Sequence, residues 1–255
     1  MSADCCFSTL LSAAQRGWLA CDGDEALLSL ALPIEGIDPL LALPQLAEQE
    51  SLQVLWDSAP GLCLAAAGPC QELELAGSRR FEQAQRFADL CLSRLHDTAP
   101  DSPAHARPRV LLRFRFFDQV SERRRSEAVV PSVQAVLPRW QLSRQGRRGW
   151  LRLNGVVSSA ADCRELAEQL WLKHEQLLKT PATPTRLTPQ ALVAASEPET
   201  WRQRYATALT RGIDLVNSGD LHKLVLAVRH RIVLADTFDP LPLLKRLRRQ
   251  QAGSC

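Results

Sequence analysis

A lysine occupies the position at which the sequence predicts the start of a buried strand. Lys223 follows Gly219, a glycine suited to end a helix, and precedes the apolar run Leu224 to Ala227. Burial of an ammonium group is unfavourable unless the group is paired, neutralised or used in chemistry. Because desolvation lowers the pKa of a lysine toward neutrality, a lysine in such a position can act as a general base. Lys223 is therefore the candidate catalytic residue. The alternative is a lysine at a sheet edge whose ammonium reaches solvent.

The elements that would position Lys223 are predicted from local patterns. A helix begins at the capping box Ser196–Glu199, with proline in its first turn, and runs to about Ser218. A strand follows from Leu221 to Val228; both of its faces are mainly apolar, which favours the interior of a sheet. A last helix covers Leu241 to Gln251. The helix before Lys223 is expected to bury four side chains at helical spacing: Tyr205, Leu209, Ile213 and Val216.

The rest of the chain is predicted as short strands and two longer helices. Turns at Pro60-Gly61 and Gly68-Pro69 indicate an antiparallel meander, and Asp97 to Pro108 is typical of a surface loop. A Thr/Pro-rich linker, 180–195, separates an N-terminal α+β region, 1–179, from a second region, 196–255. The predicted strands are 26–33, 52–56, 62–67, 72–75, 109–118, 133–142 and 149–157, and the helices are 79–95 and 160–179.

Composition excludes several classes of protein. The net charge of +3 is too small to imply a polyanionic partner, and no apolar run approaches the length of a membrane span. The N-terminus lacks the basic start of a secretory signal, so we predict a cytoplasmic protein without a membrane partner. The 8 cysteines form no Cys-x-x-Cys pair and are predicted to be free, mostly buried thiols. The histidines show no zinc-ligand spacing, so no structural metal is predicted.

Two further patterns could suggest a ligand. Basic clusters at 123–125, 144–148 and 245–249 raise the possibility of nucleic-acid binding, but they are dispersed and balanced by 28 acidic residues. We therefore predict solvated surface and no nucleic-acid partner. Trp140, Trp150 and Trp171 are predicted to pack in the core. Glu197 and Glu199 are explained as first-turn residues favoured by the helix dipole.

The segment Gly219 to Ala227 resembles the Gly-(acidic)-x-x-Lys-(Val/Ile)-Val-Leu-(Ala/Ser) motif of chorismate-utilising enzymes. Among these enzymes it is most similar to isochorismate synthases. The strands Phe114–Gln119 and Leu137–Leu142 also resemble two strands of that family, in the usual order. The resemblance covers about residues 107 to 251. One position departs from the pattern: most relatives carry an arginine five residues after the lysine, where this chain has Val228 followed by Arg229.

The resemblance implies an activity and a role for the lysine. In the family, the lysine activates water for attack on C2 of chorismate, an acid helps to expel the C4 hydroxyl, and Mg²⁺ holds the substrate carboxylate. Lys223 inherits the first role. Anthranilate synthases, which use ammonia, typically carry glutamine at this position, so a lysine favours water; salicylate synthases share the lysine. The product isochorismate would feed menaquinone or phylloquinone synthesis, or siderophore and salicylate pathways.

The resemblance also implies a fold. It predicts an α+β architecture of two antiparallel sheets stacked face to face, with helices outside and the active site in a cleft between the two halves of the enzyme. In relatives, the acid and the magnesium ligands lie in a C-terminal half, whereas this sequence ends at Cys255. We therefore expect the start of a chorismate-binding catalytic region over 196–255, an inactive chain when alone, and a monomer at full length. A non-catalytic binding relative is the alternative.

Overall fold

The computed structural model of the chain describes residues 7–21, 25–48, 50, 52–58, 61–116, 131–179, 192–195, 198–226, 232–234 and 239–250. The chain divides into two units. The first comprises Met1–Pro184 with Leu247–Cys255, and the second comprises Thr185–Arg246. The boundary after Pro184 falls inside the predicted linker, 180–195.

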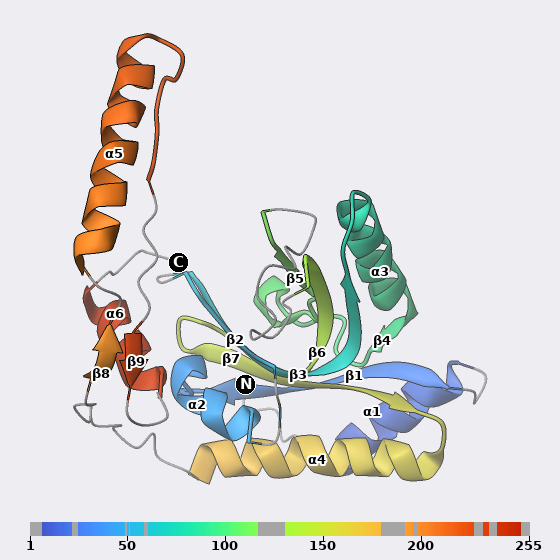
Figure 1. Cartoon of the computed structure of the whole chain (residues 1–255). Coiled ribbons are helices and arrows are strands. Elements are labelled where there is room, and N and C mark those ends of the chain that lie inside the picture. Colours follow the sequence, from blue (N-terminus) through green and yellow to red (C-terminus); the bar gives the residue numbers. More distant parts are fainter. Residues whose placement is uncertain are drawn as a thin grey trace. The chain divides into compact units, whose positions relative to one another are not determined.

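The described residues of the first unit form a seven-stranded, mainly antiparallel sheet (Figure 1). The strand order is β2-β3-β6-β7-β1-β4, with β5 paired to β6, and β1 runs parallel to β4. The predicted hairpin of β6 and β7 is confirmed: Gln145 faces Arg148, and Gly146 takes a φ of 63° in the turn. The strands are β1 Ala26–Glu35, β2 Gln53–Asp57, β3 Leu62–Leu75, β4 Leu95–Asp97, β5 Leu111–Phe114, β6 Val133–Gln145 and β7 Arg148–Val157.

The predicted meander is wrong in one respect. The strands expected at 62–67 and 72–75 are a single strand, β3, which bends at Gly68 and Pro69 instead of turning back. Pro69 faces Pro138 of β6, and the register shifts between Pro69 and Gln71. Because neither proline can donate a backbone hydrogen bond, the ladder is interrupted there and both strands bend without separating. The α+β class is confirmed, but the described residues build one bent large sheet and not two stacked ones.

Helices cover the sheet of the first unit. α1 (Phe7–Leu19), α2 (Pro39–Leu46) and α4 (Ala160–Lys179) lie on the same face, and α3 (Arg80–Arg94) packs on the ends of β3 and β6 beyond the bend (Figure 1). The main core lies between the sheet and the first three helices, whereas Ala84 of α3 joins a small second cluster with Val133 and Ala135. No helix in the described part of the chain has the length and apolar character needed to cross a membrane.

The starts of two helices follow from local chemistry. α4 has the predicted bounds, and the Asp162 amide donates to Ser159 Oγ at 3.2 Å while Asp162 Oδ2 accepts from the Ser158 amide at 2.8 Å. α2 was not predicted. Asp38 caps it by accepting a hydrogen bond from the Leu40 amide at 3.1 Å. The helix is short and contains Pro44, a residue that normally argues against a helix, so the sequence pattern did not indicate it.

The segment predicted as a surface loop, Asp97 to Pro108, is tied to the sheet. It begins in β4 and contains a 3₁₀ turn, Ala104–Ala106, and both Ser102 and Ala106 are buried. Arg152 of β7, which is fully buried, donates to the Ala106 carbonyl and pairs with Asp97 at 2.7 Å. The loop therefore covers a buried charge, which a sequence pattern of prolines and polar residues does not reveal.

Five cysteines of the described residues are free, and three of these, Cys63, Cys91 and Cys163, are buried. Burial raises the pKa of the Cys63 thiol to about 12, assisted by the nearby Asp57 carboxylate. Burial likewise raises the pKa of Cys70 to about 11. Both thiols are thus kept protonated and unreactive, which fits structural cysteines better than nucleophiles.

Replacing Gly68 by alanine is expected to lower the free energy of unfolding by about 2 kcal/mol or more. Gly68 has a φ of +65°, and a Cβ there would overlap the Glu50 carboxylate. Gly146→Ala is the matched control, since Gly146 has a φ of +63° but open space around it, and should cost about 1 kcal/mol. Denaturant unfolding of both variants measures the difference. Equal losses would mean that Glu50 moves aside without cost.

Candidate active site around Lys223

Helix α5 (Pro198–Asn217) of the second unit sets the position of Lys223. Its predicted end at Gly219 is confirmed: Gly219 takes a φ of 81°, its amide donates to the Val216 carbonyl at 3.2 Å, and the Leu221 amide donates to the Leu215 carbonyl at 3.0 Å. A left-handed residue at a helix end is the ordinary role of glycine. The chain therefore leaves α5 in a fixed direction four residues before Lys223.

The strand predicted at 221–228 is not found over 221–226, and 227–228 lie outside the described residues. Residues 223–226 have no regular secondary structure, and the Lys223 side chain is exposed. Among the described residues of the second unit, the only ladder joins β8 (Leu192–Ala195) to β9 (Ile232–Leu234), so the segment has no neighbouring strand to pair with. The expected burial of Lys223 is therefore wrong for this structure.

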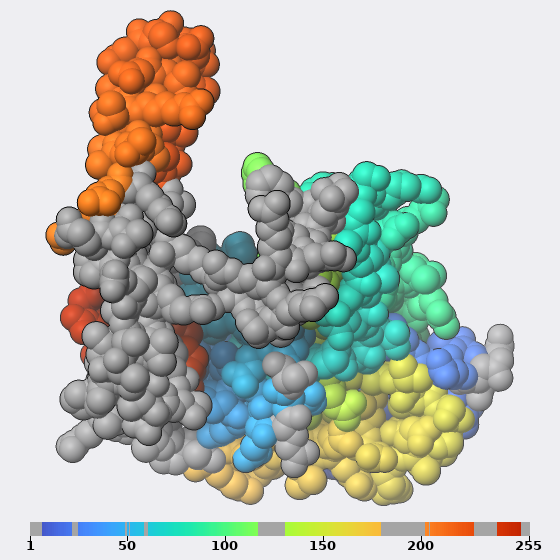
Figure 2. Space-filling view, in the orientation of Figure 1, coloured from blue at the N-terminus to red at the C-terminus, as the bar shows by residue number. Residues whose placement is uncertain are grey.

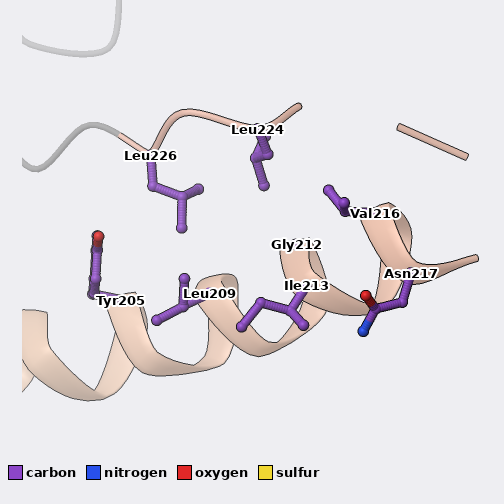
Figure 3. Close-up of a pocket in the computed structure, with 8 residues that line it drawn as sticks. All are labelled: Tyr205, Leu209, Gly212, Ile213, Val216, Asn217, Leu224 and Leu226. Carbon is purple, nitrogen blue, oxygen red and sulfur yellow. The ribbon is translucent and has the colours of Figure 1, made fainter. Parts of the chain in front are cut away.

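The alternation expected around Lys223 nevertheless persists in the extended segment. Leu224 and Leu226 lie over α5 and line a groove of about 350 Å³ along it (Figure 3). Val225, between them, is 76% exposed, and Lys223 is exposed as well. One side of the segment thus packs on the helix. The other side, which carries Lys223, is open to solvent.

The apolar face of α5 is less buried than the sequence predicts. Leu209, Ile213 and Val216 all remain exposed, Ile213 to 50%, although all three line the groove together with Tyr205 (Figure 3). The residues outside α5 that line this groove are Leu224 and Leu226. The periodicity identified the apolar face correctly, but periodicity does not state whether anything packs against it.

The described residues do not supply a magnesium site. No three His, Cys, Asp or Glu side chains among them come together closely enough to hold a metal ion. Asp220 near Lys223 accepts a hydrogen bond from Ser218 Oγ at 2.8 Å. Glu197 lies outside the described residues, as does the side chain of Glu199. The described residues therefore do not form a magnesium site, and we assign no catalytic step to a metal ion here.

Two of the basic clusters contribute arginines to contacts in the first unit. Arg248 Nη1 donates to Asp38 Oδ2 at 2.6 Å, and Arg144 Nη2 lies 3.8 Å from Asp38 Oδ1. Arg248 also contacts the Asp57 carboxylate, as an ion pair. Both arginines are thus engaged in intramolecular ion pairs, and those of Arg248 hold the end of α6 (Leu241–Gln250). The third cluster, 123–125, lies outside the described residues.

Two of the three tryptophans predicted to pack in the core do so. Trp140 is buried in the main core, and Trp171 packs against that core and meets Phe7 edge to face, with ring centroids 6.4 Å apart. Trp150 is half-buried on β7 and is not among the residues of either core cluster. The sequence analysis did not identify the buried polar residues of β7, Arg152 and Asn154. Their alternation with Leu151 and Leu153 is the pattern of a strand with its polar face toward solvent, so the sequence gives no signal of their burial.

Comparison with known proteins places these observations in a family. A model of the family described as "Chorismate binding enzyme" matches residues 12–255. The solved structure of MenF, the menaquinone-specific isochorismate synthase from Escherichia coli, is 17% identical with a TM-score of 0.46; the match covers 80% of this chain and 42% of that one. A search of curated proteins found no match. The family match spans nearly the whole chain and confirms the predicted kinship: the chain belongs to the chorismate binding enzyme family.

Proposed function

We propose that this chain is part of an isochorismate synthase, in which Lys223 activates water for attack on C2 of chorismate. The observation that carries the proposal is the family match over residues 12–255, which includes the lysine motif at 219–227. Its support from the structure is local: Lys223 sits on the open side of its segment, where a substrate could reach the ammonium.

The proposed reaction exchanges one water for another. Water adds its oxygen to C2 and gives a proton to Lys223, the ring double bonds shift, and the C4 hydroxyl leaves with a proton from an acid. Substrate and product are therefore isomers. We assign no residue of this chain as the general acid. From the family resemblance we propose magnesium as the cofactor, with its ligands outside the described residues. We propose the cytoplasm as the compartment.

A lysine that acts as a base needs to lose most of its hydration. Val225 and Lys223 are both exposed, so further cover over this side of the segment is part of the proposal. A protein segment, or the substrate itself, would exclude water and make proton transfer to the amine favourable.

The exposure of Lys223 also favours a second candidate, a non-catalytic chorismate-binding relative. Such a protein would keep the fold and the motif without turnover. Salicylate and anthranilate formation are the remaining alternatives within the family. The lysine, in place of the glutamine typical of ammonia-using relatives, speaks against anthranilate.

An isotope experiment separates these candidates. The protein isolated at its native length is incubated with chorismate and MgCl₂ in H₂¹⁸O. The products are separated by chromatography, and their masses are measured by mass spectrometry. Isochorismate carrying one ¹⁸O at C2 is expected. Salicylate, anthranilate in the presence of ammonium, or unlabelled isochorismate would each contradict the proposal. Binding of chorismate without turnover would establish the non-catalytic alternative.

A further inference from the structure

The chain passes between the two units twice, and the second passage lies inside α6. It leaves the first unit after Pro184 and returns between Arg246 and Leu247. The second unit, which carries Lys223, is therefore attached to the first at two points of the chain. Arg248 is the second residue after the return, so its contacts determine how firmly the second attachment is held.

Arg248 contacts a row of side chains at one end of the sheet. Cys63 of β3 lies opposite Asp57 of β2 and Arg144 of β6, and directly opposed residues point to the same face of a sheet. Arg248 pairs with the Asp57 carboxylate, and its Nη2 lies 3.6 Å from Cys63 Sγ. Its Nη1 donates to Asp38 Oδ2 at 2.6 Å, at the start of α2, which lies at the surface of the first unit (Figure 2). We name the contacts of Arg248 with Asp38 and Asp57 the Arg248 clasp.

The clasp is balanced in charge and only partly open to water. Its two carboxylates face two guanidinium groups, that of Arg248 and that of Arg144, which lies 3.8 Å from Asp38. The side chains of Arg248, Asp38 and Asp57 are 25%, 22% and 18% exposed. Partly buried pairs are screened less than exposed ones. Without Arg248, two carboxylates would face one cation, so the closed arrangement depends on this side chain.

Apolar burial contributes little to holding the residues after the return. Among the described residues 247–250 no side chain is fully buried: Leu247 is 39% exposed, and Arg249 is exposed as well. The buried residue of α6, Pro242, precedes the return. Segments with few buried apolar groups open locally, at a lower free energy than global unfolding. The polar contacts of Arg248 are therefore the main hold on this end of α6.

We propose that residues 247–250 form a strap that opens locally when the Arg248 clasp breaks and thereby uncovers Cys63. The closed strap fastens the second attachment of the unit that carries Lys223, and the open strap releases it. This inference does not depend on the proposed reaction, because the contacts that carry it lie within the first unit and none of its residues takes part in that reaction.

Cys63 is a natural reporter of strap opening, since it is 3% exposed when the strap is closed. The full chain is treated with iodoacetamide at increasing, non-denaturing urea concentrations, and mass spectrometry of its peptides follows the alkylation of each cysteine. Cys163, which is fully buried in the main core, reports global unfolding. Cys63 is expected to react at least about tenfold faster than Cys163 and without dependence on urea, because local opening exposes little surface. Equal rates with equal urea dependence would overturn the proposal.

Arg248→Met tests what keeps the strap closed. It should raise the alkylation rate of Cys63 by about tenfold or more, because it removes charged hydrogen bonds. Charge alone predicts the opposite sign: burial raises the pKa of the Cys63 thiol to about 12 and the Arg248 guanidinium opposes that rise, so its loss from a closed strap would leave less thiolate. Arg249→Met, at the exposed neighbour, is the matched control and should not change the rate. An unchanged or slower rate in Arg248→Met, with its fold verified by circular dichroism, would contradict the clasp.

Discussion

Replacing Lys223 by alanine is expected to lower the kcat of the native-length protein for chorismate isomerisation by about 10²–10⁴-fold, the usual contribution of a general base. The fold should not change, because the Lys223 side chain is exposed. Steady-state turnover in the presence of MgCl₂, with isochorismate separated by chromatography, measures the effect. The ¹⁸O content of any residual product then reports whether water still attacks C2.

Lys223→Arg distinguishes a base from a fixed positive charge. Arginine keeps the charge but does not give up its proton under these conditions, so the loss should match that of Lys223→Ala. Val225→Ala is the matched control, since Val225 lies on the same exposed side of the segment and should retain turnover. Activity near wild type in the alanine variant would remove Lys223 from the mechanism. Activity retained by arginine alone would assign the residue to electrostatic binding of substrate.

Arg152→Met is expected to lower the free energy of unfolding of the first unit by about 3–5 kcal/mol. Arg152 is fully buried and holds Asp97 at 2.7 Å, Ser29 Oγ at 2.8 Å and Ser102 Oγ at 3.1 Å. Methionine fills part of the volume but takes the cation away from the Asp97 carboxylate, which keeps the Ala99 amide as a donor, and removes the arginine donor from both serine hydroxyl groups. Removing one partner of a buried pair leaves the other uncompensated. Denaturant unfolding followed by tryptophan fluorescence measures the loss.

Two controls make the Arg152 result specific. Arg164→Met removes an arginine from an exposed pair and should change stability by less than about 0.5 kcal/mol. Arg152→Met combined with Asp97→Leu removes both buried charges and should recover part of the loss, because no carboxylate is then left uncompensated. If Arg152→Met proved no more destabilising than Arg164→Met, the loop Asp97 to Pro108 would be held by something other than this network.

Local sequence accounts for much of the fold. The Gln145–Arg148 turn, the capping pair of Ser159 and Asp162, and the left-handed end at Gly219 depend on residues within a few positions of one another. The interactions that decide such features act over one turn of chain, so they are visible in the sequence. The family followed from the same kind of information, because the motif around Lys223 is contiguous.

The tertiary structure decided what depends on distant partners. Whether Gly68 and Pro69 turn the chain or bend a strand depends on Pro138 lying opposite, 69 residues later in the chain. The apolar face of α5 and the lysine after it were recognisable, but their exposure depends on which elements pack there. The Arg152 network joins segments far apart in sequence. By itself the sequence determined residue chemistry and local geometry; burial and long-range pairing are properties of the packed chain, because they depend on groups that only folding brings together.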